Sequence, residues 1–220
     1  MPRQSRIDTA GALHHVMVRG IERTAIFRND KDRESFLDRL GGILVGSSTP
    51  CYAWSLLQNH AHFLLRTGKI PIARVMMKIL TGYAVTFNRR YRRAGHLFQN
   101  RYKSILCEED VYLRELVRYI HLNPVRAGVV KDLSELETYR YSGHSVLMGK
   151  TKREWQDRAY VLRIFGERER EAKRGYVSYV SEGVEQGRKP ELVGGGLLRS
   201  VGGLEGTEGD AGFGRKGERG

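Results

Sequence analysis

The order of strand-like and helix-like segments constrains the fold of this chain more than any other feature. Side chains alternate between the two faces of a strand, whereas they recur about every 3.6 residues on one face of a helix. These patterns predict strands at residues 13–19, 51–57, 60–66 and 97–106, and helices at residues 30–44, 71–91 and 110–121. The order is the split βαβ arrangement of ferredoxin-like folds, followed by a further helix. We therefore expect an α+β domain whose four-stranded antiparallel sheet carries helices on one face.

Local signals mark the ends of several segments. Asn29 and Asp30 offer a cap for the first helix, and Pro71 suits the first turn of the second. Only Gln58 and Asn59 separate the second and third strands, which indicates a hairpin. The predicted segments are thus joined by short connections.

The basic charge is concentrated in the part of the chain that is expected to fold. Residues 1–150 contain 24 Lys and Arg against 13 Asp and Glu, a net of +11, whereas residues 151–220 contain 14 against 12, a net of +2. A compact domain with this balance repels itself, so a polyanionic partner such as nucleic acid explains the charge. A generally basic protein without such a partner is the alternative.

Cysteine content and hydropathy bound the class of protein. Cys51 and Cys107 are too few for a disulfide framework or a four-sulfur zinc site, and they fit a reducing cytoplasm. The N-terminus lacks the apolar run of a signal peptide, and no stretch reaches the ~18 apolar residues of a membrane span. We expect a cytoplasmic protein that has no membrane partner.

The chain divides into three parts by pattern and composition. Residues 1–148 are expected to form the principal domain, which would hold any functional site, and residues 149–190 are expected to form a small helical accessory segment. Glycine occupies 11 of the 27 positions from 194 to 220. A tail at residues 191–220 is therefore expected to be disordered.

The segment NHAHFLLR contains the sharpest local signal. His60 and His62 are two residues apart on a predicted strand, so their imidazoles point to the same face and form a two-point clamp for a divalent ion. Ordinary polar residues on an exposed sheet face are the alternative. The neighbouring Phe63, Leu64 and Leu65 favour a half-buried strand, where two histidines are costly without a ligand.

The segment RYIHLNPVRAG contains the second signal. Tyr119 and Asn123 are four residues apart and lie on one face of a helix. Tyrosine can act as a covalent nucleophile, and asparagine can offer an amide oxygen to a metal. For this helix taken alone, however, a core aromatic is the default interpretation of Tyr119. Pro124 restricts Asn123 and favours a kink or an end of the helix there.

These segments together resemble the small insertion-sequence tyrosine transposases, above all their relatives associated with repetitive extragenic palindromes (REP) in bacteria. The resemblance covers about residues 10–145. It rests on the triplet His60-Ala61-His62, the pair Tyr119 and Asn123, the strand GHLFQNRYKS at 95–104 and the run NPVRAG at 123–128. Ala61 departs from the family's bulkier central residue, which weakens the packing of the triplet.

The resemblance implies an enzyme that cleaves and rejoins single-stranded, hairpin-containing DNA. In the family, the residue matching Tyr119 attacks a DNA phosphate and leaves a covalent phosphotyrosine, while those matching His60, His62 and Asn123 hold a metal. Magnesium prefers oxygen ligands and imidazole suits softer ions, so Mg²⁺ or Mn²⁺ is the expected cofactor. A homodimer, in which Tyr119 serves either its own site or the neighbour's, is left open.

Substrate contacts are expected from basic residues in and after the second helix. Phosphates attract cations, and the interleaved Tyr91 and Tyr102 can stack on unpaired bases, although a solvated helix end is the alternative for each residue. The expected DNA-binding residues are Arg89, Arg90, Arg92, Arg93, Arg101, Lys103 and Arg126.

Several rival readings follow from the same sequence. Five residues separate Gly143 from the GKT run at 149–151 where a phosphate-binding loop requires four, so no nucleotide cofactor is expected. Tyr112 is the rival nucleophile, and the other five histidines are interpreted as structural or DNA-contacting because none has a paired partner on one face. A non-catalytic, transposase-derived nucleic-acid-binding protein and a metal-dependent hydrolase remain as alternative functions.

Overall fold

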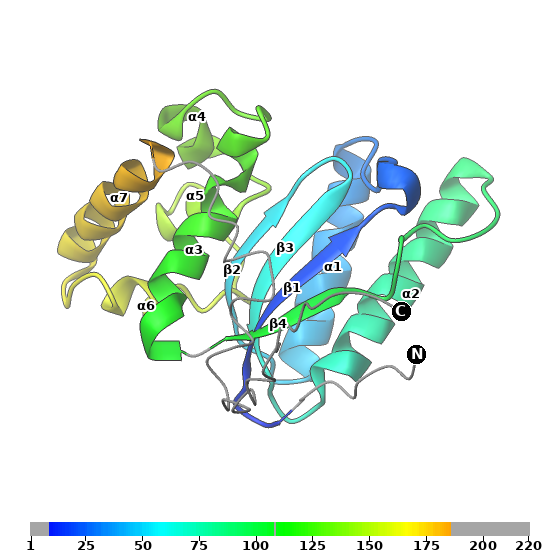
Figure 1. The fold of residues 1–220 in the computed structure, drawn as a ribbon, viewed down its shortest axis with the longest axis horizontal. Helices are drawn as coiled ribbons and strands as arrows, with labels where there is room; N and C mark the ends of the chain where they lie inside the picture. Colours follow the sequence, from blue (N-terminus) through cyan, green and yellow to red (C-terminus); the bar gives the residue numbers. More distant parts are fainter. Residues whose placement is uncertain (1–8, 108, 186–220) are drawn as a thin grey trace, which may run out of the picture.

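A computed structural model describes residues 9–107 and 109–185 of the chain (Figure 1). Four strands form the sheet: β1 (Leu13–Arg19), β2 (Cys51–Leu56), β3 (His60–Arg66) and β4 (Lys103–Cys107). The long helices are α1 (Asp30–Gly46), α2 (Ile72–Tyr91), α3 (Glu109–Arg126) and α7 (Glu169–Glu185). The short helical elements are η1 (Ile21–Arg23), α4 (Leu133–Thr138), α5 (Gly143–Leu147) and α6 (Arg158–Arg163).

The sheet has the order β2-β3-β1-β4, and each neighbouring pair is antiparallel. The two central strands, β3 and β1, pair along their whole length, from Leu13 opposite Arg66 to Arg19 opposite His60. The chain order β1-α1-β2-β3-α2-β4 confirms the predicted ferredoxin-like α+β fold.

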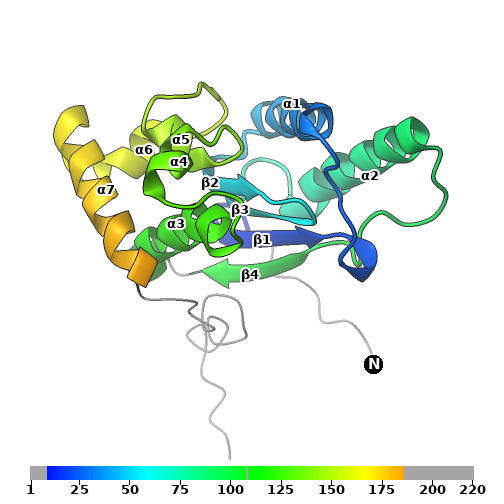
Figure 2. The same cartoon turned by 90° about the horizontal axis from the view of Figure 1, so that it is seen from above.

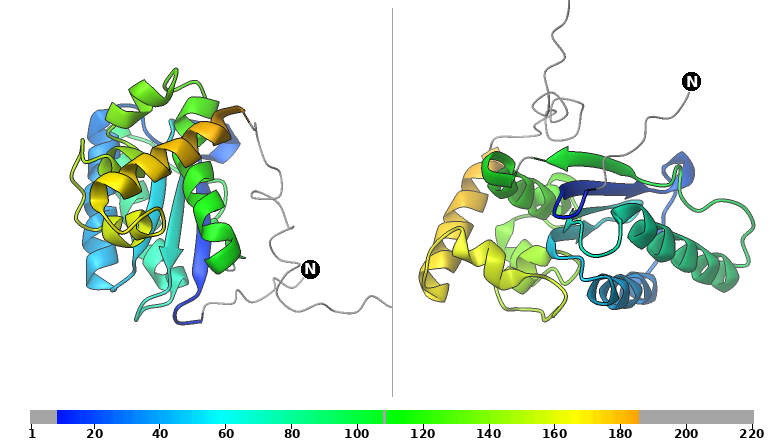
Figure 3. Two further views of the ribbon diagram at one scale, coloured as in Figure 1. Left: turned by 90° about the vertical axis from the view of Figure 1, so that its left-hand side faces the viewer. Right: turned by 90° about the horizontal axis from the view of Figure 1, so that it is seen from below.

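Two hydrophobic cores lie on opposite faces of the sheet, because its residues alternate in direction. On β3, Phe63 and Leu65 pack with α1 and α2, whereas Leu64 packs with α3. Figure 3 shows the sheet between α1 on one side and α3 on the other. Helices α1 and α2 are the two that the sequence predicts on one face of the sheet. Helix α3, which is predicted to follow the fourth strand, packs on the opposite face.

The later helices gather around α3, away from α1 and α2 (Figure 2). Helix α7 packs against α3 and α6, and its Tyr176 and Val180 are fully buried in the α3 core. Residues 158–163 and 169–185 are helical. The division of the chain into a domain at 1–148 and an accessory segment at 149–190 stays a prediction. The predicted tail at 191–220 lies outside the described residues.

The fourth strand is shorter than predicted, because it begins at Lys103 and not at residue 97. Met17 pairs with Lys103, and Gly20 forms an isolated bridge to Phe98. Three steps along β1 thus face five steps along the other segment, so two extra residues bulge from the ladder between them. This bulge forms part of the wall of the cavity described below.

Helix α3 continues through Pro124 to Arg126, whereas the sequence pattern ends it at residue 121. The short helices α4 and α5 were not among the predicted elements, because segments of six and five residues carry too little periodicity to detect. In residues 9–107 and 109–185, no helix is both long enough and apolar enough to cross a membrane.

Candidate functional site

A cavity of about 570 Å³ opens on the α3 side of the sheet. It lies where β1 and β3 meet the bulge before β4 and the C-terminal half of α3. Its lining contains His60, His62, Tyr119 and Asn123, together with Arg19, Gln99, Asn100, Tyr102, Lys103, Arg126 and several apolar residues. All four residues predicted to act on the scissile phosphate or a metal therefore line one cavity of a single chain.

Strand β3 places His60 and His62 beside each other. They share a face of the strand with Leu64, and their ring centroids are 5.3 Å apart. Only 5% of His62 is exposed, so the alternative of a polar residue on an open sheet face does not apply to it. The Nδ1 atom of His60 lies 2.7 Å from the Oδ1 atom of Asn59, which orients the ring.

His15 is the residue at this site that the sequence reasoning missed. It lies on β1 with its ring stacked on His62, and its Nε2 atom is 3.0 Å from the Nδ1 atom of His62. The statement that the remaining histidines lack a partner on one face is therefore wrong for His15. The contact forms only when β1 pairs with β3, so it can be inferred from the register of these two strands and not from either strand alone.

Asn123 is oriented by the backbone of its own helix. Proline has no N–H, so Pro124 cannot donate to the carbonyl of Ile120 as a helical residue would. The side-chain amide of Asn123 donates to the Tyr119 carbonyl at 3.0 Å and approaches the Ile120 carbonyl at 3.5 Å. Because these contacts engage the amide nitrogen of Asn123, its amide oxygen is the atom that could coordinate a metal.

Tyr119 lies among the imidazoles. Its ring meets those of His15 and His62 edge to face, with centroids 5.8 and 5.9 Å apart. The guanidinium carbon of Arg126 lies 5.5 Å from the centre of the Tyr119 ring. Arg126 also donates to the carbonyl of Gly183 on α7 at 3.2 Å, so the last turns of α7 help to hold this cation beside the tyrosine.

Burial is the main influence on the charge of His62. Desolvation, followed by the nearby His15, His60 and Arg19, holds the pKa of His62 well below its ordinary value. The ring is therefore neutral at neutral pH, which is the state that binds a metal.

The donor set fits a divalent metal that takes some of its ligands from the protein and the rest from solvent or substrate. Two imidazole nitrogens and one amide oxygen would come from His60, His62 and Asn123, and each of the three side chains has its other polar atom held by a neighbour. Across residues 9–107 and 109–185, no cluster of three or more His, Cys, Asp and Glu forms a metal site. Water and phosphate oxygens would complete the shell, as is usual for Mg²⁺.

The predicted DNA-binding residues fall into different environments. Lys103 and Arg126 line the cavity, and Arg101 lines a neighbouring groove. Arg89 and Arg92 are exposed at the end of α2, and Arg93 donates to the side chain of Asn88 there.

Two other residues at the end of α2 have structural partners. Arg90 forms an ion pair with Asp32, a fully buried carboxylate, and the Tyr91 hydroxyl donates to the same carboxylate at 2.7 Å. Arg90 and Tyr91 therefore join α2 to α1 through Asp32. Because their polar groups are engaged in this way, both residues are poorer candidates for DNA contact than the exposed Arg89.

The rival nucleophile, Tyr112, lies elsewhere on α3. It packs against the α3 core and is not among the residues that line the cavity. His121 and His144 are also paired, contrary to the sequence reasoning, because the Tyr176 hydroxyl lies 2.8 and 2.7 Å from their Nδ1 atoms.

The chain is similar to known proteins in fold and in sequence. A solved structure described as "Structure of the REP associates tyrosine transposase bound to a REP hairpin" resembles the chain in fold. Its TM-score is 0.54 at 18% sequence identity, over 70% of this chain and 91% of that one. No curated protein matches the sequence. The family described as "Transposase IS200 like" matches residues 9–123, which is just over half of the chain. This range includes His60, His62, Tyr119 and Asn123. The chain therefore belongs to the IS200-like transposase family.

Proposed function

We propose that this transposase cleaves and rejoins single-stranded, hairpin-containing DNA through a covalent phosphotyrosine on Tyr119. The observation that carries the proposal is the convergence of His60, His62, Tyr119 and Asn123, from two separate elements, on one cavity. The basic residues Lys103 and Arg126 line the same cavity and suit a phosphate. All of these residues come from one chain, which supports the use of Tyr119 at the site of its own subunit.

The reaction is a transesterification. The phenol oxygen of Tyr119 attacks a DNA phosphorus and loses its proton to water. A bond forms between this oxygen and phosphorus while the bond from phosphorus to the 3′ oxygen breaks. The 3′ oxygen takes up a proton and leaves as a hydroxyl, so the energy of the phosphodiester is retained for rejoining.

Ionising the nucleophile is the main cost that the site must offset. A free tyrosine has a pKa near ~10, so its anion costs on the order of 4 kcal/mol at neutral pH. The Arg126 guanidinium, 5.5 Å from the ring, favours the anion and the charge that develops on the phosphate. His60, His62 and Asn123 would hold Mg²⁺ or Mn²⁺, which would supply Lewis-acid chemistry at the phosphate.

Hairpin DNA is proposed as the substrate because the similarly folded REP-associated transposase is described as bound to a REP hairpin. The net charge of +11 on residues 1–150 supports a polyanionic substrate independently of that likeness.

The decisive experiment incubates the protein with labelled, hairpin-containing single-stranded DNA and Mn²⁺ or Mg²⁺. We expect a covalent protein–DNA adduct that withstands denaturation. Tyr119→Phe abolishes it, and Tyr112→Phe, the matched control on the same helix, retains it. His62→Ala lowers adduct formation at a fixed metal concentration.

Other outcomes assign the alternatives. Cleavage without an adduct in the unmodified protein identifies a hydrolase in which water attacks. Hairpin binding without cleavage in either metal identifies a non-catalytic binding protein. An adduct that survives Tyr119→Phe and disappears in Tyr112→Phe moves the nucleophile to Tyr112.

A further inference from the structure

Arg126, which lines the cavity around Tyr119, is held by two separate segments of the chain. Its guanidinium carbon lies 5.5 Å from the centre of the Tyr119 ring, and its Nη2 atom donates to the Gly183 carbonyl on α7 at 3.2 Å. Both Arg126 and α7 lie beyond residues 9–123, the range that matches the transposase family. The contact between them is therefore a feature of this chain that the family match does not cover.

The end of α7 suits a cation. Gly183 lies in the last turn of the helix, and the last four carbonyls of a helix have no N–H partner within it. The same end is the negative end of the helix dipole, which attracts a positive charge. A guanidinium that donates to the Gly183 carbonyl is thus held in a place that α7 sets.

The contact depends on a close approach of α7 to α3. Tyr176, Val180 and Gly183 are buried and share one face of α7, because they are spaced by four and three residues. A Cβ atom at position 183 would lie 2.5 Å from the Cδ atom of Arg118 and 3.0 Å from its Cγ and Nε atoms. The absence of a side chain at 183 therefore lets the helices come close enough for the carbonyl to reach Arg126.

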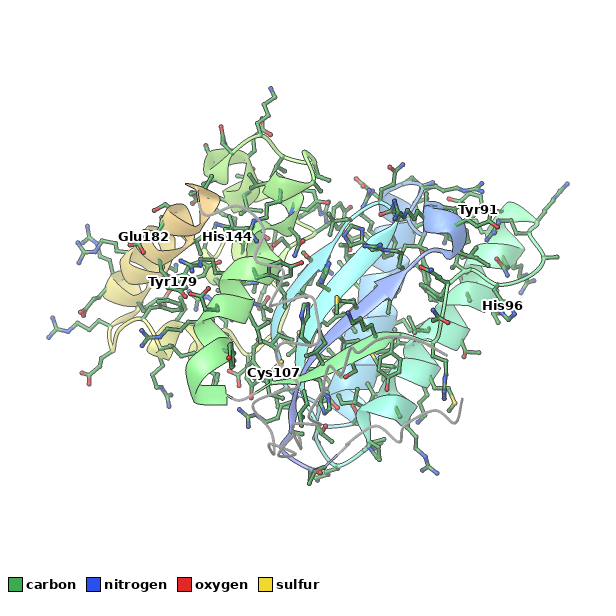
Figure 4. All side chains as sticks on the ribbon, in the orientation of Figure 1. Tyr91, His96, Cys107, His144, Tyr179 and Glu182 are labelled. Atoms are coloured by element: carbon green, nitrogen blue, oxygen red, sulfur yellow. The ribbon has the colours of Figure 1, made fainter. Side chains whose placement is uncertain are left out.

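Arg118 on α3 fixes this approach. Its side chain is buried, its Nη1 atom donates to the Tyr179 carbonyl at 3.3 Å, and its guanidinium carbon lies 4.1 Å from the centre of the Tyr179 ring. Its Nη2 atom donates to Glu115 at 2.6 Å, and the Tyr179 hydroxyl donates to the same carboxylate. Figure 4 shows Tyr179 where α7 faces α3. Arg118 cannot swing away from a new side chain at 183 without breaking these bonds.

We propose that the last turn of α7 positions Arg126 for the attack by Tyr119, with Gly183 and Arg118 as positioning residues. Gly183 supplies the carbonyl, and Arg118 holds α7 at the distance where that carbonyl meets Arg126. Neither positioning residue lines the cavity. The effect on chemistry rests on the proposed function, whereas the contact itself can be measured without DNA.

The test measures the single-turnover rate of adduct formation and, without metal, the affinity for the hairpin in Gly183→Ala. The new Cβ atom displaces either Arg118 or the end of α7, so the carbonyl moves away from Arg126. We expect the rate to fall by about tenfold or more, because a small misplacement of a positioned group is costly in the transition state. Hairpin affinity changes by less than about twofold, since the lost interaction serves the transition state.

Ser178→Ala is the matched control. It places alanine at an exposed position of the same helix, where it also raises helix propensity but meets no part of α3. Both the rate and the hairpin affinity are expected to stay at the values of the unmodified protein.

A double-substitution cycle separates positioning from a general loss of structure. If Gly183 acts through Arg126, then adding Gly183→Ala to Arg126→Gln lowers the rate by less than about twofold further. A purely structural effect would lower the rate by the same factor in both backgrounds.

Arg118 gives a second route to the same result if Gly183→Ala does not fold. Arg118→Met keeps an apolar stem but removes the donor to the Tyr179 carbonyl, and we expect it to lower the rate while hairpin affinity is retained. Arg118→Lys keeps the cation beside Glu115 and restores part of the rate.

NMR of the arginine Nε–H groups observes the contact directly in DNA-free protein. The Arg126 signal is assigned by its absence in Arg126→Gln. We expect this signal to shift in Gly183→Ala and to keep its position in Ser178→Ala.

Several outcomes would overturn the inference. These are an unchanged rate in folded Gly183→Ala, an equal loss of rate with and without Arg126→Gln, or an Arg126 signal that does not move in Gly183→Ala. If the signal shifts but the unmodified protein forms no adduct, the proposed function fails while the contact between α7 and Arg126 stands.

Discussion

The Nε2 atom of His15 lies 3.0 Å from the Nδ1 atom of His62, across the pairing of β1 with β3. This contact fixes the rotation of the His62 ring and engages its Nδ1 atom. The Nε2 atom of His62 is therefore the nitrogen that we assign to the metal. A histidine ligand that is oriented through its second nitrogen is a common feature of metal sites.

Replacing His15 is expected to weaken metal binding. His15→Phe keeps a ring in the space but removes the hydrogen bond, and Mn²⁺ affinity measured by titration calorimetry on DNA-free protein falls by about 10- to 100-fold. His15→Gln, which keeps a polar partner for His62, restores part of the affinity. Unchanged Mn²⁺ affinity in His15→Phe, in a protein that remains folded, would remove His15 from the site.

Replacing Arg126 is expected to slow the chemistry more than it weakens DNA binding. Its guanidinium lies beside the Tyr119 ring, where the anion forms. Arg126→Gln therefore lowers the single-turnover rate of adduct formation by about 100-fold or more, a loss typical of one stabilising donor. Hairpin affinity changes much less, and exposed Arg92→Gln serves as the control. A loss confined to affinity would make Arg126 a binding residue only.

Arg90 is expected to stabilise the fold and to contribute little to DNA binding. Asp32 is fully buried and accepts from Arg90, the Tyr91 hydroxyl and the Arg28 N–H. Asp32→Ala leaves these donors without their acceptor and lowers the free energy of unfolding by about 3 kcal/mol.

The comparison of Arg90→Ala with Arg89→Ala separates the two roles. Arg90→Ala lowers the free energy of unfolding, measured in urea, and Arg89→Ala does not. Hairpin affinity at low salt falls in Arg89→Ala and is retained in Arg90→Ala at a temperature where both are folded. The reverse pattern would return Arg90 to the DNA-binding residues.

Stability is expected to fall with acidification because of the histidines around Tyr176. Figure 4 shows His144 within the group of helices that includes α3 and α7. Burial lowers the pKa of His144 to about 4, a little offset by Glu137, and holds the pKa of His121 well below its usual value. Below pH ~6.5 the unfolded chain binds protons that the folded protein excludes, so the free energy of unfolding decreases as pH falls toward 4.

The contribution of His144 is measurable by urea unfolding at pH 7 and pH 5. His144 accounts for roughly 2 kcal/mol of the decrease between these values. In His144→Gln, the decrease in the free energy of unfolding between pH 7 and pH 5 is smaller by roughly 2 kcal/mol, whether or not the substitution changes stability at pH 7. A pH dependence identical to that of the unmodified protein would show that His144 is protonated in the folded state.

The sequence by itself determined the order of elements and which of the main site residues share a face of a strand or helix. Alternation on β3 placed His60 and His62 on one face, and helical spacing placed Tyr119 and Asn123 on another, because both patterns are local properties of the backbone. The family resemblance rested on the same residues, and the match over residues 9–123 bears it out.

Tertiary structure alone decided which residues meet. His15 is 47 positions from His62, and Gly183 is 57 positions from Arg126, so no local period connects either pair. The same holds for Arg90 and Asp32, whose ion pair requires α1 and α2 to pack together. The bulge before β4 also depends on a change of register between β1 and the segment that precedes β4, which neither segment encodes alone. These features arise from packing between distant segments, and packing is set by the whole fold.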